Sequence, residues 1–247
     1  VNPSVDSISW IKSPFVFVNV ASGRETRGGG EGGGISKGKS SRNSSADSIG
    51  NAAEAELAAA LASTLPRALA PRGDVSAATR DGHFCGTPGA IIAFYAEQVR
   101  RIRAELDDED SIANRALKRF IARLSTETPS GSFDRPGVHS VDSFQGSEAD
   151  VVVLSAVRAN ANGSVGFLSD KRRLNVALTR ARRLCVVLGH SDTLKRSDSV
   201  DLRALVTHAE RRGCVVDEAT VRKWLESWTP GVESTGSESP KVKRRRV

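Results

Sequence analysis

Short apolar runs that hardly alternate constrain the fold of this chain more than any other feature. Five stretches are predicted to be buried strands: FVFVNV (15–20), AIIAF (90–94), GVHSV (137–141), VVVLSAV (151–157) and LCVVLG (184–189). A strand with one face in water alternates apolar and polar residues, whereas a strand covered on both faces does not need to. Three of these runs are nearly continuous, so the pattern predicts a parallel β-sheet with helices on both faces.

Helical patterns lie between the strands and support an α/β fold. We expect helices over 51–65, ending before Pro66, and over 95–106, 171–183, 202–212 and 218–227. Alternation of strands and helices predicts a layered fold with right-handed crossover connections.

Two polar segments interrupt this order. Residues 22–49 are dominated by Gly and Ser, and we expect a disordered insertion. Residues 107–136 begin acidic, contain one amphipathic piece at 112–124 and end in Ser, Thr, Pro and Gly, so we expect partial disorder. The domain would then comprise 10–21 and 50–228, followed by a disordered basic tail at 229–247.

The first insertion contains GGISKGKS (Gly33–Ser40), which fits the phosphate-binding pattern G-x-x-x-x-G-K-[ST]. A working phosphate loop follows a strand directly and opens a helix, whose N-terminus binds the anion. Here the nearest predicted strand ends at Val20, and SRNSSADSIG follows without a helix start. The context therefore predicts a flexible linker at this position.

Charge and cysteine content narrow the class of protein. The formal charge of +7 and the pI of about 9.7 suggest a polyanionic partner, for which nucleic acid and a merely basic tail are both open explanations. The three cysteines are far apart, which argues against a disulfide framework or a zinc site and fits a reducing compartment. No apolar run approaches the roughly 20 residues of a membrane span, so we expect no membrane partner.

The chain starts with Val and contains no Met, and we therefore expect a fragment that lacks its N-terminal part. Its chemistry-bearing residues are concentrated between 140 and 189. SFQGSE precedes the most apolar strand and offers an amide, a flexible glycine and a carboxylate; an ordinary turn with a capping acid is the alternative. Arg158 follows the same strand, where it could face a ligand crevice or be a rim charge.

The predicted helix 171–183 separates apolar and basic residues. Leu174, Ala177, Leu178 and Ala181 fall on one arc, and Arg172, Arg173, Arg180 and Arg183 fall on the opposite side. The helix has no acidic residue to offset these charges, with Asp170 or Ser169 as the expected N-cap. We expect an anion to relieve the repulsion, and phosphate suits the bidentate geometry of guanidinium.

These residues carry a family resemblance. VDSFQGSEADVVVLSAVR (141–158) resembles motif V of superfamily 1 helicases, and GFLSDKRRLNVALTRARR (166–183) resembles motif VI. The combination is similar to the branch that contains the nonsense-mediated-decay RNA helicase, senataxin and the immunoglobulin-mu-binding-protein helicase. IIAFYAEQVRRI (91–102) resembles motif IV, with Phe94 where Pro is usual, and NAAEAEL (51–57) resembles an N-x-x-E-A segment. The resemblance covers about 15–194 without the insertions.

The resemblance implies a RecA-like domain, a three-layer sandwich of the P-loop NTPase type, and the second of two such domains. ATP would bind between them, and the missing first domain would hold the phosphate loop and the Mg²⁺ ligands. The implied function is the motor half of an ATP-dependent RNA or DNA helicase, inactive as a fragment. A non-catalytic nucleic-acid-binding or regulatory module is the alternative, although the retention of Gln145, Glu148 and Arg180 favours a motor.

Residue roles follow from the matched motifs. Arg180 would be the arginine finger, and Gln145 would couple the ATP state to the nucleic-acid strand. The implied nucleotide contacts are Gly146, Glu148, Arg173 (as a support of Arg180) and Tyr95, and the implied contacts to single-stranded RNA or DNA are Ser140, Asp142, Ser143 and Arg158.

The C-terminal SPKVKRRRV resembles a nuclear localisation signal. It implies a nuclear import receptor as a partner of Lys241–Arg246 and a nuclear location, with the cytoplasm as a second one. A solvated or phosphate-binding tail is the alternative.

Overall fold

The computed structural model describes residues 8–28, 48–69, 89–124 and 135–227. Its main element is a six-stranded sheet in the order β5-β4-β6-β7-β1-β8, and every neighbouring pair is parallel. The strands are β1 (Phe15–Asn19), β4 (Ala90–Ala93), β5 (Gly137–Ser140), β6 (Ala149–Ser155), β7 (Ala181–Gly189) and β8 (Val215–Asp217). The five predicted strands and the α/β class are confirmed.

Strand β6 explains why the apolar runs do not alternate. It lies between β4 and β7, and Val151, Val152, Val153 and Leu154 are each at most 1% exposed. Alternate residues of this run belong to different cores, since Val151 and Val153 face one layer of helices and Val152 and Leu154 face the other. Both faces of the sheet are therefore apolar, as a covered parallel sheet requires.

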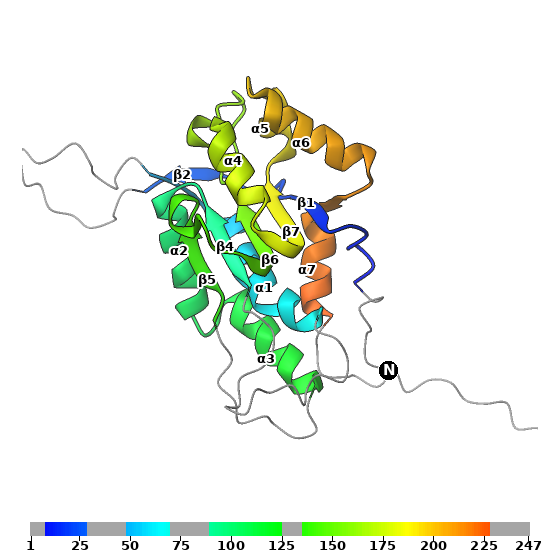
Figure 1. Ribbon diagram of the computed structural model, residues 1–247. Helices are drawn as coiled ribbons and strands as arrows, with labels where there is room; N and C mark the ends of the chain where they lie inside the picture. The colour runs from blue at the N-terminus through cyan, green and yellow to red at the C-terminus, as the bar shows by residue number, and fades with distance from the viewer. Residues whose placement is uncertain (1–7, 29–47, 70–88, 125–134, 228–247) are drawn as a thin grey trace, which may run out of the picture.

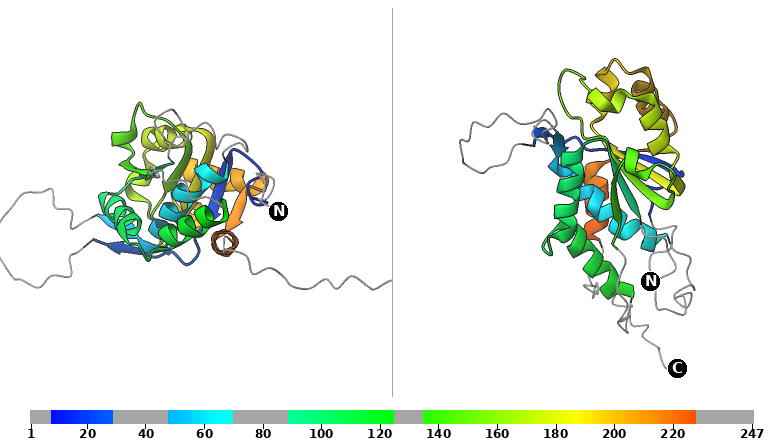
Figure 2. Two further views of the ribbon diagram at one scale, coloured as in Figure 1. Left: turned by 90° about the horizontal axis from the view of Figure 1, so that it is seen from below. Right: turned by 60° about the vertical axis from the view of Figure 1, so that its left-hand side comes forward.

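Helices cover both faces and complete a three-layer sandwich (Figure 1 and Figure 2). One face carries α1 (Ala52–Ala68), α2 (Ala96–Asp107), α3 (Ile112–Leu124) and α7 (Glu218–Glu226). The other carries α4 (Lys171–Leu178), α5 (Ser191–Arg196), α6 (Val200–Arg211) and the short 3₁₀ turns η4 (Asp142–Phe144) and η5 (Gly166–Ser169). No helix in the described part of the chain is long and apolar enough to cross a membrane.

Helix α1 runs further than the sequence predicts. It continues to Ala68 with Pro66 inside its last turn, so the predicted end before Pro66 is wrong. Proline removes a single backbone donor, and this loss near a helix end is offset by packing. Leu57, Leu61 and Leu65 are fully buried, which anchors α1 against the sheet.

The predicted helix 171–183 is shorter and becomes a strand. Helix α4 ends at Leu178, and β7 begins at Ala181, where Ala181 pairs with Ala149 of β6. Strand pairing on both sides of β7 outweighs the helical periodicity of its first residues. The expected single face of four arginines is wrong: Arg180 lies in the turn, and Arg183 lies on β7 and donates to the Leu69 carbonyl beside α1.

Outside the sheet, β2 (Glu25–Arg27) and β3 (Ile49–Asn51) form an antiparallel ribbon. They flank the segment that contains GGISKGKS, and that stretch lies outside the described residues. The predicted nuclear import signal at Lys241–Arg246 lies outside them as well.

A fully buried carboxyl group ties α1 to the end of β6. Glu54 accepts hydrogen bonds from Ser155 Oγ and from the Val157 amide, both at 2.7 Å, and from Asn51 Nδ2 at 3.2 Å. Gln98 of α2 joins the cluster by donating to Ser155 Oγ and to the Asn51 carbonyl. Three elements are therefore joined through polar groups that have no access to water.

This cluster holds a strained residue. Val157 has a φ of 70°, which a β-branched side chain rarely adopts and which costs about 1–3 kcal/mol. Its amide donates to Glu54 and its carbonyl accepts from Asn51 Nδ2, so both backbone groups are fixed. The chain direction after β6 thus depends on Glu54.

Replacing Glu54 with Ala should lower the free energy of unfolding by at least about 2 kcal/mol, because buried donors lose their acceptor. Urea denaturation measures the change. Glu56→Ala is the matched control, since Glu56 forms a partly exposed pair with Arg222 that is worth about 0–1 kcal/mol. Equal losses in the two variants would contradict a special role for Glu54.

The stability should also depend on pH through this group. Burial raises the pKa of Glu54 from 4.5 to about 7, although hydrogen bonds from Ser155, Val157 and Ala156 act in the opposite direction. Between these values the folded state binds more protons than the unfolded state. The part of the free energy of unfolding that comes from the protonation of Glu54 is therefore largest below pH 4.5 and is lost as the pH rises through about 7.

Denaturation curves at pH 5 and pH 7.5 check this dependence. The difference in unfolding free energy between the two pH values should shrink in Glu54→Gln, which cannot titrate. An unchanged difference would assign the pH dependence to other groups.

Candidate nucleotide and nucleic-acid interface

The parallel sheet divides the predicted site residues between two edges. At the amino ends of the strands lie Gln145, Gly146 and Glu148, which precede β6, and Arg180, which precedes β7. At the carboxyl ends lie Tyr95 after β4, Ser140 at the end of β5, Asp142 and Ser143 in η4, and Arg158 after β6. Arg173 of α4 joins the second group through Asp142.

Backbone pairing brings the amino-edge residues together. The Arg180 carbonyl accepts from the Ala149 amide at 3.1 Å, which places position 180 beside position 148. The side chain of Glu148 forms an ion pair with Arg182, with 3.1 Å between Nε and Oε2. Residues 34 positions apart in the chain thus meet at one corner of the sheet.

The loop before β6 is open at this corner. Gly146 has a φ of 86°, a left-handed conformation that favours glycine, and a Cβ placed there would meet no atom within 4 Å. Phe144 is buried and fixes the start of the loop, while Gln145 and Glu148 are exposed. A ligand could therefore approach the backbone at Gly146 closely.

Arg180 lies at the C-terminus of α4. Its guanidinium donates from Nε to the Val176 carbonyl and from Nη2 to Thr179 Oγ1, both at 3.0 Å. A cation is favourable there because the last carbonyls of a helix carry partial negative charge. Arg180 is partly exposed, so its guanidinium remains within reach of an anion at the surface.

At the carboxyl edge, Ser140 and Ser143 form a compact hydroxyl turn. The Ser143 amide donates to Ser140 Oγ at 3.2 Å, and Ser143 Oγ donates to the Ser140 carbonyl at 3.0 Å. Between them, Asp142 accepts two hydrogen bonds from Arg173 at 3.1 and 3.0 Å. Arg173 thus contacts the predicted strand-binding turn, and no contact with Arg180 appears among the described residues.

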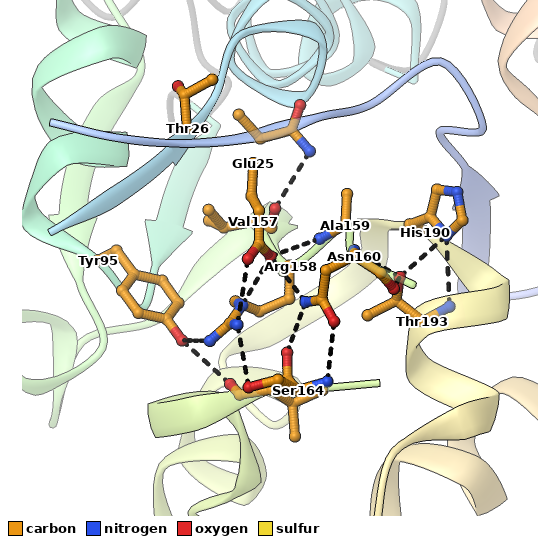
Figure 3. Close-up of polar contacts among 12 residues, drawn as sticks. Glu25, Thr26, Tyr95, Val157, Arg158, Ala159, Asn160, Ser164, His190 and Thr193 are labelled. Atoms are coloured by element: carbon orange, nitrogen blue, oxygen red, sulfur yellow. Dashed lines mark hydrogen bonds and ion pairs between the residues drawn. The ribbon is translucent and has the colours of Figure 1, made fainter. Parts of the chain in front are cut away.

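Arg158 is buried in a polar network rather than exposed at the rim (Figure 3). Its Nε donates to Glu25 at 2.9 Å and its Nη2 donates to the same carboxylate at 3.2 Å. Its Nη1 donates to the Tyr95 hydroxyl and its Nη2 to Ser164 Oγ, both at 3.3 Å. Tyr95 is 5% exposed and donates in turn to the Val165 carbonyl.

Glu25 is the centre of this network. Besides Arg158, the Ala159 amide and Asn160 Nδ2 donate to it at 2.9 Å (Figure 3). Burial by itself would raise the pKa of Glu25, but the hydrogen bonds from Arg158, Asn160 and Ala159 hold that pKa below its usual value. The carboxylate therefore stays ionised and anchors the β2–β3 ribbon to the end of β6.

Sequence reasoning missed two members of these clusters. Glu25 lies in the segment expected to be an insertion, 133 positions from Arg158, and no local signal connects them. Glu54 lies in the N-x-x-E-A segment at 51–57, but this motif does not indicate that the side chain of Glu54 is fully buried.

The amino edge fits part of a nucleotide site. It offers a guanidinium for a phosphate, a carboxylate for hydroxyl groups and an open glycine backbone. No group of three or more His, Cys, Asp or Glu in the described part of the chain could hold a metal ion.

Comparison of the sequence with known proteins identifies the family to which this chain belongs. The AAA domain family matches residues 3–192. The Regulator of nonsense transcripts 1 homolog of Arabidopsis thaliana is 49% identical over 80 residues, which are 32% of this chain and 6% of that protein. ATP-dependent helicase NAM7 of Saccharomyces cerevisiae is 48% identical over 80 residues, covering 32% of this chain and 8% of that protein.

Helicase sen1 of Schizosaccharomyces pombe is 40% identical over 99 residues, which are 40% of this chain and 5% of that protein. The chain thus spans a small part of each of these relatives. The family match includes five of the six strands completely, all except β8, and also the predicted site residues at both edges of the sheet. The chain belongs to the AAA domain family and is part of a superfamily 1 helicase motor, as its second RecA-like domain.

Proposed function

We propose that this chain completes the ATP site of an RNA or DNA helicase at the amino edge of its sheet and grips single-stranded nucleic acid at the carboxyl edge. The observation that carries the proposal is the meeting of Glu148 and Arg180 across the β6–β7 pair. The family match supports the same assignment.

At the amino edge, Arg180 acts as the arginine finger. Its guanidinium leaves the Val176 carbonyl and neutralises charge that develops on the γ-phosphate. Glu148 accepts hydrogen bonds from the sugar, and Gly146 lets the backbone approach the phosphates. ATP and Mg²⁺ are held mainly by a first RecA-like domain, which supplies the metal ligands.

At the carboxyl edge, the hydroxyl turn of Ser140 and Ser143 contacts the backbone of the strand. Such contacts are largely independent of sequence and weaken with salt. Asp142 and Arg173 fix this turn against α4. Arg158 and Tyr95 are buried and stabilise the loops at this edge without contacting the strand, because their polar groups are bonded to Glu25 and to the Val165 carbonyl.

Two segments connect the edges and would couple hydrolysis to movement. Helix α4 carries Arg173 near its start and leads to Arg180 just beyond its end. The segment 141–148 runs from the hydroxyl turn through Gln145 to Glu148. The Asp142–Arg173 ion pair ties the two segments together, so movement of one displaces the other.

A non-catalytic module is the second candidate. In this structure Arg180 donates to Thr179 Oγ1, and Glu148 forms an ion pair with Arg182. These contacts are equally compatible with a module that binds nucleic acid without hydrolysing ATP. ATP turnover in a protein that carries both motor domains distinguishes the two functions.

Arg180→Ala in that two-domain protein should lower nucleic-acid-stimulated ATP hydrolysis by about 10³-fold or more, because the developing charge loses its cation. Affinity for a single strand without nucleotide should stay within about twofold. Arg183→Ala is the matched control, since Arg183 lies three residues away and donates to Leu69 on the other face. Unchanged turnover in Arg180→Ala would refute the finger assignment.

The 247-residue chain alone should hydrolyse ATP negligibly, because it would contribute only one side of the site. A phosphate-release assay with and without single-stranded nucleic acid measures this. Turnover that Lys39→Ala abolishes would instead identify Gly33–Ser40 as a working phosphate loop.

A further inference from the structure

Phe167 is an aromatic side chain that the fold leaves in solvent. It is 64% exposed, and the other exposed large hydrophobic residue in the described part of the chain is Val200. The next residue, Leu168, is 1% exposed, so η5 separates a buried side chain from an exposed one. A single exposed apolar residue has no meaning by itself, and the surroundings of Phe167 decide its role.

A cation lies against the ring. The Arg173 guanidinium carbon is 6.0 Å from the centroid of Phe167, within the range of a cation–π contact. The same guanidinium donates to Asp142, which lies between Ser140 and Ser143 in the sequence, and the hydroxyls of these two serines are hydrogen-bonded to each other at 3.0 Å. The ring therefore stands beside the turn assigned to the backbone of a single strand.

The buried network fixes the base of this ring. Gly166, directly before Phe167, has a φ of 50°, and a Cβ placed there would lie 2.8 Å from Arg158 Nη1 and 3.0 Å from the Tyr95 hydroxyl. Tyr95 also lies beside the ring, with 6.1 Å between centroids and 54° between planes. Figure 3 shows Tyr95 and Arg158 converging on the segment around Ser164, which leads into Phe167. A ring mounted in this way loses little freedom when a ligand stacks on it.

We propose that Phe167 is a stacking platform for one nucleobase of the bound single strand, with Arg173 beside it to attract the adjoining phosphate. The inference rests on the proposed function and adds a contact to the bases themselves. Every base has a π-face, so the contact would be tolerant of sequence. A protein partner would need a wider apolar patch, whereas one exposed ring beside a cation and two hydroxyls matches a single nucleotide.

Equilibrium binding to the protein that carries both motor domains tests the proposal. The probe is a single-stranded oligonucleotide of mixed sequence in which 2-aminopurine replaces one base at successive positions. Stacking quenches 2-aminopurine fluorescence, and one position should be quenched in the wild-type complex. Phe167→Ala should raise Kd about tenfold and remove the quenching at that position.

Two other variants provide controls. Val200→Ala removes an equally exposed apolar residue from α6 and should change neither Kd nor quenching. Phe167→Trp keeps an aromatic face and should retain both. If Phe167→Ala were unstable, Phe167→Leu would keep the apolar bulk and should still lose the quenching.

The outcomes separate this inference from the function on which it rests. If the wild-type protein binds no single strand, the proposed grip fails and the stacking platform fails with it. If the wild-type protein binds and Phe167→Ala or Phe167→Leu preserves both Kd and the quenching, the stacking role alone is overturned. An oligonucleotide with an abasic site at the quenched position should bind the wild-type protein with a Kd about tenfold higher than the intact oligonucleotide. The same abasic site should hardly change the Kd of Phe167→Ala.

Discussion

The parallel pairing of β6 with β7 is the constraint on which the rest of the structure depends. It aligns Ala149 with Ala181, and Glu148 and Arg180, which precede these residues, therefore meet at the amino edge. Because the two strands run in the same direction, the chain between them must return along the whole length of the sheet. Helix α4 makes this return, so its start lies at one edge and its end at the other. Two separate groups of predicted site residues on one short domain follow from that geometry.

The carboxyl edge depends on the partly buried carboxyl group of Glu25 and the fully buried carboxyl group of Glu54, which have different electrostatic surroundings. Glu25 meets the Arg158 guanidinium and further donors, so its pKa is held down and its charge is retained. Glu54 meets neutral donors and no cation in its cluster, and burial raises its pKa to about 7. The first group ties a β-ribbon to the sheet, and the second fixes the strained turn at Val157. Together they fix the loops beyond β6, and the proposed grip on a single strand depends on that rigidity.

The strands could be predicted because burial on both faces leaves a pattern that is local in the sequence. The run 151–157 is apolar at successive positions, and its neighbours along the chain supply the helices that cover it. The end of α4 could not be predicted in this way. Residues 179–183 continue the helical periodicity, and the choice of strand depends on β6 and β1, which lie far away in the sequence. For that reason, the four arginines expected on one face of a helix do not share a face in the structure.

The site shows the same division. By itself, the sequence determined the α/β class, the strand positions and the motif resemblance. It also showed that Gln145, Gly146, Glu148 and Arg180 lie close to the ends of strands. Each of these features depends on residues that are neighbours in the sequence. Only the tertiary structure decided that Arg158 is buried, that Arg173 forms an ion pair with Asp142 and that Phe167 is exposed to solvent. These outcomes depend on pairings such as that of Arg158 with Glu25, which are 133 positions apart in the sequence. The energy of a largely buried ion pair is set by its partners, and local sequence patterns do not specify them.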